Sequence, residues 1–145
     1  YTYVNTSSAI TQGTELLLRV RPVESLDLQV GYVFLDARDL QRDRFLQGRP
    51  RHRGTFRARY SHAGAGFSAT VRGSLVGERP YYETGGDGET QEVMDDLYLS
   101  LGVRLEQRVG DYVGLFAGAD NLAGAGGRYL TIRPRGFYAG LSVDY

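Results

Sequence analysis

Apolar and polar residues alternate at every second position along most of this chain, and no stretch of useful length has the spacing of an amphipathic helix. The segments with this pattern are Tyr1–Val4, Thr14–Arg21, Leu26–Phe34, Phe56–Tyr60, Phe67–Leu75, Leu97–Glu106, Tyr112–Leu122 and Phe137–Tyr145. Successive side chains of a strand point to opposite faces, so each segment predicts a strand with one apolar and one polar face. The chain is therefore predicted to be all-β, with about eight antiparallel strands.

The connections between these segments alternate in length. The short ones, of hairpin length, are Pro22–Ser25, Ser61–Gly66 and Gly110–Asp111. The long and irregular ones are Ala37–His52, Arg79–Asp95 and Ala123–Arg135, while Asn5–Gln12 is intermediate. In an up-and-down meander this order places the short turns at one end and the long loops at the other. That asymmetry is typical of transmembrane β-barrels of the outer membrane.

Alternation alone does not distinguish a soluble barrel, whose apolar face is inside, from a membrane barrel, whose apolar face meets lipid. The composition of the polar face favours the membrane barrel. Every basic residue apart from the two histidines is arginine, and the chain contains no lysine, which a water-facing surface normally uses heavily. The planar guanidinium fork satisfies several acceptors at once, as a hydrogen-bonded lumen requires. Strands of about nine to eleven residues also match a tilted membrane strand.

On this interpretation the two faces have separate roles. The residues expected to face the lumen are Glu15, Arg19, Arg21, Arg57, Arg59, Arg72, Arg104 and Glu106. Those expected to face lipid are Leu16, Leu18, Val20, Leu28, Val30, Leu99, Leu101 and Val103. The aromatic residues near strand ends on the apolar side are Tyr32, Phe34, Tyr60, Phe67, Phe137 and Tyr145, which predicts two aromatic girdles around a lipid band.

Composition excludes several other classes of function. The chain has 145 residues, enough for a single domain, and its 17 basic and 17 acidic residues give no net charge. This balance gives no case for a nucleic-acid partner. The absence of cysteine excludes disulfide scaffolds, thiolate metal sites and thiol catalysis. No apolar run is long enough for a membrane-spanning helix. We expect no cofactor.

The candidate chemical sites are weak. The polar-face arginines could line a path for anionic solutes, but a structural ladder neutralised by Glu15, Asp27, Glu106 and Asp120 is the favoured interpretation. The acidic segment 81–96 has oxygen ligands but lacks EF-hand spacing, so a solvated, flexible loop is expected. His52 and His62 have no partner at metal-ligand or catalytic spacing and are expected in loops. The run Gly124–Gly127 lacks the features of a phosphate loop. We therefore expect no metal site and no enzymatic activity.

Several motifs resemble the C-terminal part of a TonB-dependent outer-membrane receptor. Gly13–Pro22 followed by Leu26–Arg38 resembles the strand–turn–strand pair of that family, and Gly48–Arg53 resembles its basic run before a descending strand. Asp120-Asn121-Leu122 resembles the start of the "NLF-D" signature, although Ala123-Gly124 stands where the family usually has Phe-Asp. Arg133–Tyr138 with the terminal aromatic resembles the last strand. The resemblance covers nearly the whole chain, but no plug domain or TonB-contacting segment is present.

The resemblance implies the last strands of a 22-strand barrel in the outer membrane of a Gram-negative bacterium, importing siderophore- or cobalamin-like solutes. It also implies a C-terminal signal for the barrel-assembly machinery at Phe137, Leu141, Val143 and Tyr145. The expected partners are outer-membrane lipid and lipopolysaccharide, the assembly machinery, and further barrel strands or other membrane subunits. Two alternatives stay open: a self-contained eight-stranded barrel resembling OmpA or OmpX that acts as an anchor or assembly partner, and a soluble lipocalin-like ligand-binding barrel.

Overall fold

The computed structural model of the protein describes residues 8–129 and 132–143, and this part of the chain is all-β, as predicted. The strands are β1 (Ala9–Val23), β2 (Leu26–Asp39), β3 (Arg44–Phe45), β4 (His52–His62), β5 (Phe67–Val76), β6 (Arg79–Thr84), β7 (Thr90–Asp95), β8 (Tyr98–Val109), β9 (Val113–Asp120) and β10 (Gly136–Val143). A single 3-10 turn, η1 (Ala63–Ala65), joins β4 to β5. Among the described residues, no helix has the length and apolarity needed to cross a membrane.

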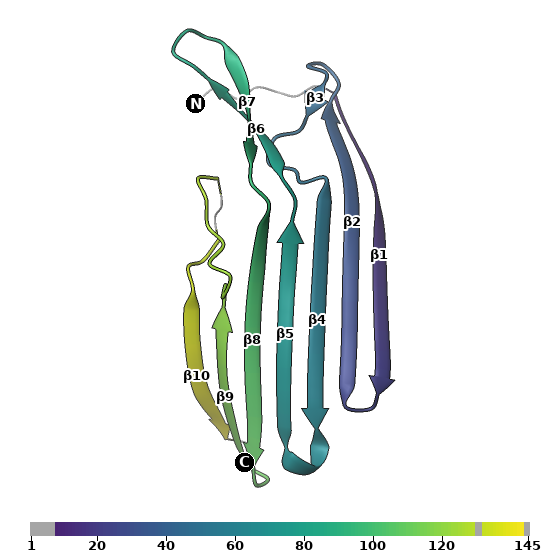
Figure 1. Ribbon diagram of the computed structural model, residues 1–145, viewed down its shortest axis with the longest axis vertical. Coiled ribbons are helices and arrows are strands. Elements are labelled where there is room, and N and C mark those ends of the chain that lie inside the picture. Colours follow the sequence, from purple (N-terminus) through teal and green to yellow (C-terminus); the bar gives the residue numbers. More distant parts are fainter. Residues whose placement is uncertain (1–7, 130–131, 144–145) are drawn as a thin grey trace.

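The long strands form one antiparallel meander in the order β1-β2-β4-β5-β8-β9-β10, with β3 paired to the end of β2 (Figure 1). Each neighbour in this order is reached by the next long strand along the chain, so there are no crossovers. Strands β6 and β7 form a separate two-stranded hairpin above the main sheet. In the described part of the chain β1 and β10 lie at opposite edges and do not pair with each other. The sheet is therefore open, and closure into a small barrel is not found.

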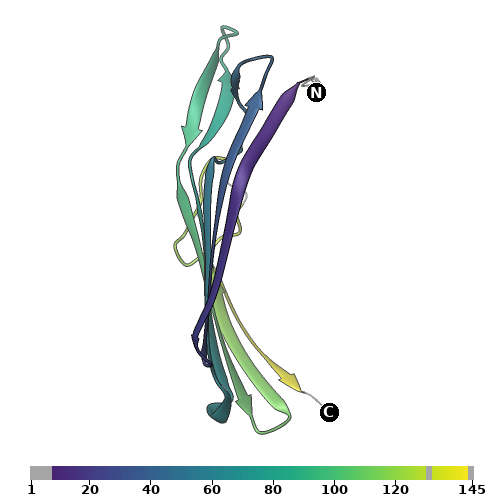
Figure 2. The same cartoon turned by 90° about the vertical axis from the view of Figure 1, so that its right-hand side faces the viewer.

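The main sheet is a single curved layer with no second layer packed on it (Figure 2). The whole chain exposes 10700 Å² of surface, whereas a folded monomer of 16.1 kDa typically exposes about 7400 Å². The few buried apolar side chains, Ala37, Val76 and Ala119, do not form a core. Because an uncovered sheet cannot bury enough apolar area to offset the entropy of ordering it, the apolar face must be covered by something else in the working protein.

The cross-strand register assigns every strand residue to one of two faces, because residues directly opposite each other in an antiparallel pair point to the same side. One row joins Leu18, Val30, Phe56, Gly73 and Leu101 across five strands. The adjacent row joins Arg19, Gln29, Arg57, Arg72 and Gly102. The first row is apolar and the second is polar, so the two faces that the alternation predicts are the two faces of this sheet.

The two ends of the sheet differ as the connection lengths predict. The short turns after β1, β4 and β8 lie together at one end, and the long connections lie together at the other (Figure 1). Two of the short turns use glycine in the left-handed region, Gly66 with φ 62° and Gly110 with φ 63°, where a side chain would be strained. We refer to these as the short-turn end and the long-loop end.

The structure corrects several boundaries. The connection Arg79–Asp95, expected to be an irregular flexible loop, is the paired hairpin β6–β7. Ala9–Gln12 belongs to β1 rather than to a connection. His52 and His62, expected in loops, are the first and last residues of β4. In each case pairing with a neighbouring strand extends the sheet beyond the segment that shows strict alternation. The predicted strand Tyr1–Val4 lies outside the described residues.

Candidate functional site

The apolar face contains all the residues that the sequence predicts to meet lipid. Leu16, Leu18 and Val20 of β1 lie opposite Tyr32, Val30 and Leu28 of β2. On the same face, further towards the β10 edge, Leu99, Leu101 and Val103 of β8 lie opposite Leu75, Gly73 and Val71 of β5. Many of these side chains are largely exposed; Leu16 is 65% and Leu18 58% exposed. Several apolar residues depart from the pattern and lie on the polar face, among them Leu17, which is 60% exposed, Val33 and Phe116.

On the polar face, ion pairs between arginines and carboxylates join residues of different strands. On β1 and β2, Asp27 accepts from Arg19 at 2.6 Å and from Arg21 at 3.3 Å. On the far side of the face, Arg72 of β5 reaches Asp120 of β9 at 2.9 Å. The first group joins the neighbouring strands β1 and β2, and the second joins β5 to β9 across β8, so the ion pairs fix these strands relative to one another.

A second cluster on the polar face is centred on Glu106 of β8. This carboxylate accepts from Arg104 at 2.7 Å and from the Ser68 hydroxyl at 3.0 Å, and Arg59 lies 4.0 Å away. The predicted structural ladder is therefore present for Asp27, Glu106 and Asp120. The prediction was wrong for Glu15, which has no arginine partner among the described residues and lies opposite the apolar Val33.

Some polar-face arginines have no carboxylate partner in the part of the chain that is described. Arg57 of β4 lies between Gln29 and Arg72 in the register, with no acidic side chain within salt-bridge distance. Arg53, at the long-loop end of the same strand, is also unpaired and lies opposite Val33 and Val76. The sequence analysis missed Arg53 because the strict alternation of that segment begins only at Phe56.

Three grooves on the polar face adjoin one another. A groove of about 270 Å³ runs between Arg57, Arg59, Arg72 and Arg104. A second, also about 270 Å³, extends from Arg57 and Arg59 to Arg19, Arg21 and Asp27. A third, of about 370 Å³, shares Arg72 with the first and lies at the long-loop end. Because each groove shares an arginine with the next, the three lie next to one another along the polar face.

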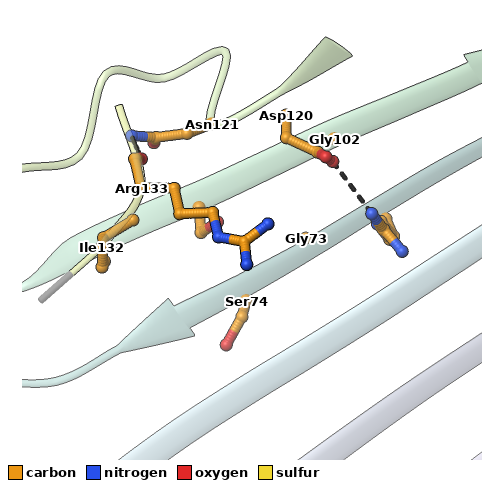
Figure 3. Close-up of a pocket in the computed structure, with 9 residues that line it drawn as sticks. Gly73, Ser74, Gly102, Asp120, Asn121, Ile132 and Arg133 are labelled. Atoms are coloured by element: carbon orange, nitrogen blue, oxygen red, sulfur yellow. Dashed lines mark hydrogen bonds and ion pairs between the residues drawn. The ribbon is translucent and has the colours of Figure 1, made fainter. Parts of the chain in front are cut away.

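The groove at the long-loop end is completed by the connection between β9 and β10. Its lining includes Ser74, Ser100, Asp120, Ile132 and Arg133. Figure 3 shows Arg133 extending from this connection over the strands. The Arg72–Asp120 ion pair lines the same groove. Arg133 has no carboxylate partner among the described residues. The sequence analysis did not single it out as a site residue because no strand pattern covers it.

Asn121 holds this connection in place. Its side chain is buried, at 5% exposure, and it donates to the carbonyl oxygens of Ala125 at 2.9 Å and of Arg133 at 3.0 Å. Its side-chain oxygen accepts from the backbone N–H of Ala125 at 2.8 Å. Its backbone has φ 52°, a left-handed conformation that asparagine tolerates better than most residues. Asn121 therefore ties together the two limbs of the segment that carries Arg133.

Gly102 leaves the space in which the Arg72–Asp120 ion pair forms. A Cβ at this position would lie 3.0 Å from Asp120 Oδ1 and 3.2 Å from Arg72 Nε. Both contacts are closer than ordinary van der Waals distance, so the absence of a side chain allows the two charged groups to meet over β8. This close approach is a reason for glycine in the middle of a strand, where it is otherwise unfavourable.

The long connections pack against one another above the sheet. Tyr81 of β6 stacks on Tyr129 with a centroid distance of 4.0 Å, and Tyr129 donates a hydrogen bond to Glu83, which raises the pKa of the tyrosine. Tyr82 donates to the carbonyl of Phe45 at 3.0 Å. The acidic segment 81–96 is thus part of an ordered assembly, and within the described residues no cluster of histidine, aspartate and glutamate has the geometry to hold a metal ion.

Two solved structures share this fold. One is Pseudomonas aeruginosa FpvA bound to heterologous pyoverdines, as an iron complex, with a TM-score of 0.70, 14% identity, and coverage of 81% of this chain and 16% of that chain. The other is the FpvAI–pyocin S2 complex, with a TM-score of 0.71, 13% identity, and coverage of 93% and 18%. The fold is therefore related to that of a TonB-dependent receptor. No family model matches the sequence, and no curated protein matches it.

The chain spans less than a fifth of the length of these two structures. This relation fits the open sheet, whose edge strands β1 and β10 have no partner on their outer sides in the described part of the chain. The residues of the predicted assembly signal lie on the second of these edges. Phe137, Leu141 and Val143 all point to the apolar face of β10 and are exposed, whereas Tyr145 lies outside the described residues.

Proposed function

We propose that this chain forms part of the wall of an outer-membrane β-barrel of the TonB-dependent receptor type, with its apolar face towards lipid and its polar face towards the lumen. The observation that carries the proposal is the single-layer antiparallel meander with one apolar and one ion-paired polar face. A soluble sheet would cover its apolar face with protein. Here large apolar side chains lie exposed along that face, as they do where lipid covers a barrel.

The rim of the apolar face at the long-loop end supports contact with lipid headgroups. Tyr32 and Phe34 lie against His52, and the Tyr32 hydroxyl is 2.7 Å from His52 Nδ1. The Arg51 guanidinium lies 5.7 Å from the centroid of Phe34 and 4.9 Å from that of Phe45. Aromatic rings with polar groups suit the boundary between hydrocarbon and water, and the arginine suits the phosphates of lipopolysaccharide. We therefore place the long-loop end at the outer surface of a Gram-negative outer membrane.

The proposed role is uptake of a scarce solute rather than catalysis. FpvA in the first similar structure is bound to pyoverdines as an iron complex, and a siderophore-like chelate is accordingly the proposed class of solute. The polar face with its chain of grooves would form one side of the route. Further barrel strands would pair with the free edges of β1 and β10, because unpaired backbone groups in hydrocarbon are very unfavourable. The apolar face of β10 would be read by the barrel-assembly machinery.

The test of this orientation uses the absence of cysteine in the sequence. Single cysteines replace Leu101 on the apolar face or Ser100, its neighbour on the polar face, and each is labelled with bimane in the full-length protein in lipid vesicles. We expect the label at position 101 to emit at shorter wavelength and to be quenched by brominated lipid tails. The label at position 100 should be quenched by aqueous iodide instead. Equal accessibility of both labels to iodide would contradict the proposal.

A further inference from the structure

The polar face carries more positive charge than its carboxylates balance. The strand arginines on this face are Arg19, Arg21, Arg53, Arg57, Arg59, Arg72, Arg104 and Arg108, and its strand carboxylates are Glu15, Asp27, Asp39, Glu106 and Asp120. The balanced net charge of the sequence hides this excess, because much of the acid lies in the long connections at the end of the sheet. A face that served only as an ion-paired ladder would have little need for surplus cations.

The excess is concentrated at particular residues. Arg19, Arg21, Arg59, Arg72 and Arg104 each lie within 4.0 Å of a carboxylate oxygen, whereas Arg53, Arg57 and Arg133 have no carboxylate partner among the described residues. Arg57 is also directly opposite Arg72 in the register, an arrangement of like charges that is unfavourable unless an anion offsets it. Two of the three unpaired arginines line grooves, Arg57 in the middle of the face and Arg133 at the long-loop end.

These two residues line neighbouring grooves. Arg72 lines both the groove of Arg57 and the groove of Arg133 at the long-loop end. Arg57 also lines the groove that extends to Arg19 and Arg21 near the short-turn end. Volumes of about 270 and 370 Å³ hold a compact solute or one arm of a larger chelate. Ser74 and Ser100 add hydroxyl donors at the groove of the long-loop end.

We propose that Arg133 and Arg57 are successive recognition residues for solutes that carry several carboxylate groups, and that the ion-paired arginines between them hold the strands in register. Carboxylate is the matching chemistry because the guanidinium fork binds its two oxygens in parallel. This inference rests on the proposed function, since it assigns the charge class of the solute that the polar face would admit. Solute recognition and the holding of the strands in register are thus assigned to different arginines of the same face.

The test measures binding of propane-1,2,3-tricarboxylate to the full-length protein in detergent micelles by calorimetry, with its trimethyl ester as the uncharged control. We expect the acid to bind and the ester not to bind. Loss of one charge-assisted hydrogen bond in Arg57→Gln or Arg133→Gln should weaken binding about tenfold or more. Arg49→Gln removes the same charge from an exposed loop residue outside the grooves and should leave the affinity unchanged.

A second variant is expected to bind the acid more tightly, a result that misfolding of the variant would not produce. Glu106→Gln releases Arg59 and Arg104 from their carboxylate and should tighten binding several-fold. The inference is overturned if the wild-type protein does not bind the acid, if it binds the ester equally, or if Arg57→Gln and Arg133→Gln bind as the wild type does. The labelling experiment uses no ligand and reports only which face meets lipid, so loss of binding with the expected labelling result overturns this inference alone.

Discussion

The side-chain amide of Asn121 donates a hydrogen bond of 3.0 Å to the backbone carbonyl of Arg133, twelve residues further along the chain. This bond joins the end of β9 to the segment that leads into β10. Through this bond the buried Asn121, just after the end of β9, positions the segment that carries the Arg133 guanidinium over the polar face. The described residues of this segment have no strand pairing, and the Asn121 bond holds them together with the stacking of Tyr129 on Tyr81.

Replacing Asn121 should release this segment. Asn121→Gly keeps the backbone freedom that φ 52° requires and removes all three side-chain hydrogen bonds. We expect a loss of about 1–3 kcal/mol in local stability, because buried partners are left unsatisfied. Hydrogen exchange at the Ala125 amide measures it. The control Asn121→Asp keeps the oxygen that accepts from the Ala125 amide and loses only the donor group. Exchange at the Ala125 amide that is unchanged in Asn121→Gly would contradict the assigned role of Asn121.

An arginine on the apolar face should be far more costly than one on the polar face. Leu101→Arg places a charge in the middle of the proposed lipid band, and we expect a loss of about 2–4 kcal/mol in unfolding free energy. Ser100→Arg, on the neighbouring residue, should cost much less because its side chain points to the polar face beside Ser74. Urea unfolding of the full-length protein in bilayers compares the two. Equal costs would show that the faces are assigned incorrectly.

Gly73 and Gly54 form a matched pair of strand glycines on the apolar face. A Cβ on Gly73 would collide with the ring of Phe56, which lies across it, whereas a Cβ on Gly54 would meet only Leu75 Cβ at 3.9 Å. We therefore expect Gly73→Ala to destabilise the sheet by about 1–3 kcal/mol through overpacking, and Gly54→Ala to be nearly neutral. The unfolding midpoints of the two variants measure the difference. If both substitutions act only through strand propensity, the two midpoints should shift by the same amount, which would contradict the overpacking at Gly73.

The connection after β2 should open at acid pH. Arg42 holds the pKa of Asp39 below its usual range, and the carboxylate also accepts from the backbone N–H groups of Gln41 and Arg42 at 3.0 and 3.3 Å. Because the pKa is lower in the folded chain than in the unfolded one, the contribution to stability is complete above about pH 4. It is lost as the pH falls through the lower folded value.

Hydrogen exchange at the Arg42 amide should show this loss after correction for intrinsic rates. Asp39→Asn keeps an acceptor oxygen that does not titrate, so its protection should not change over the same pH range. Equal pH dependence in the two proteins would assign the opening to another group.

Sequence reasoning succeeded where the physics is local. Leu16, Leu18 and Val20 share a face because the strand period is two, and no knowledge of neighbours is needed to see it. The short turns followed from their length, and Gly66 and Gly110 provide the left-handed conformation there. Sequence reasoning failed where a side chain's neighbours on other strands determine its contacts. Glu15 was expected to neutralise an arginine, but the register places it opposite Val33. His52 became a strand residue only because β2 pairs with it.

Local patterns predict the long strands over most of the chain, the two faces and the different lengths of the connections at the two ends. These follow from the alternation of side chains and from turn chemistry, which depend on near neighbours. The open sheet, the pairing of β6 with β7 and the identity of the ion-paired arginines follow only from the folded arrangement. Pairing depends on residues far apart in sequence, such as Arg72 and Asp120, or Asn121 and the carbonyl of Arg133. Arg57 remains unpaired because register places it between Gln29 and Arg72, and alternation cannot reveal register.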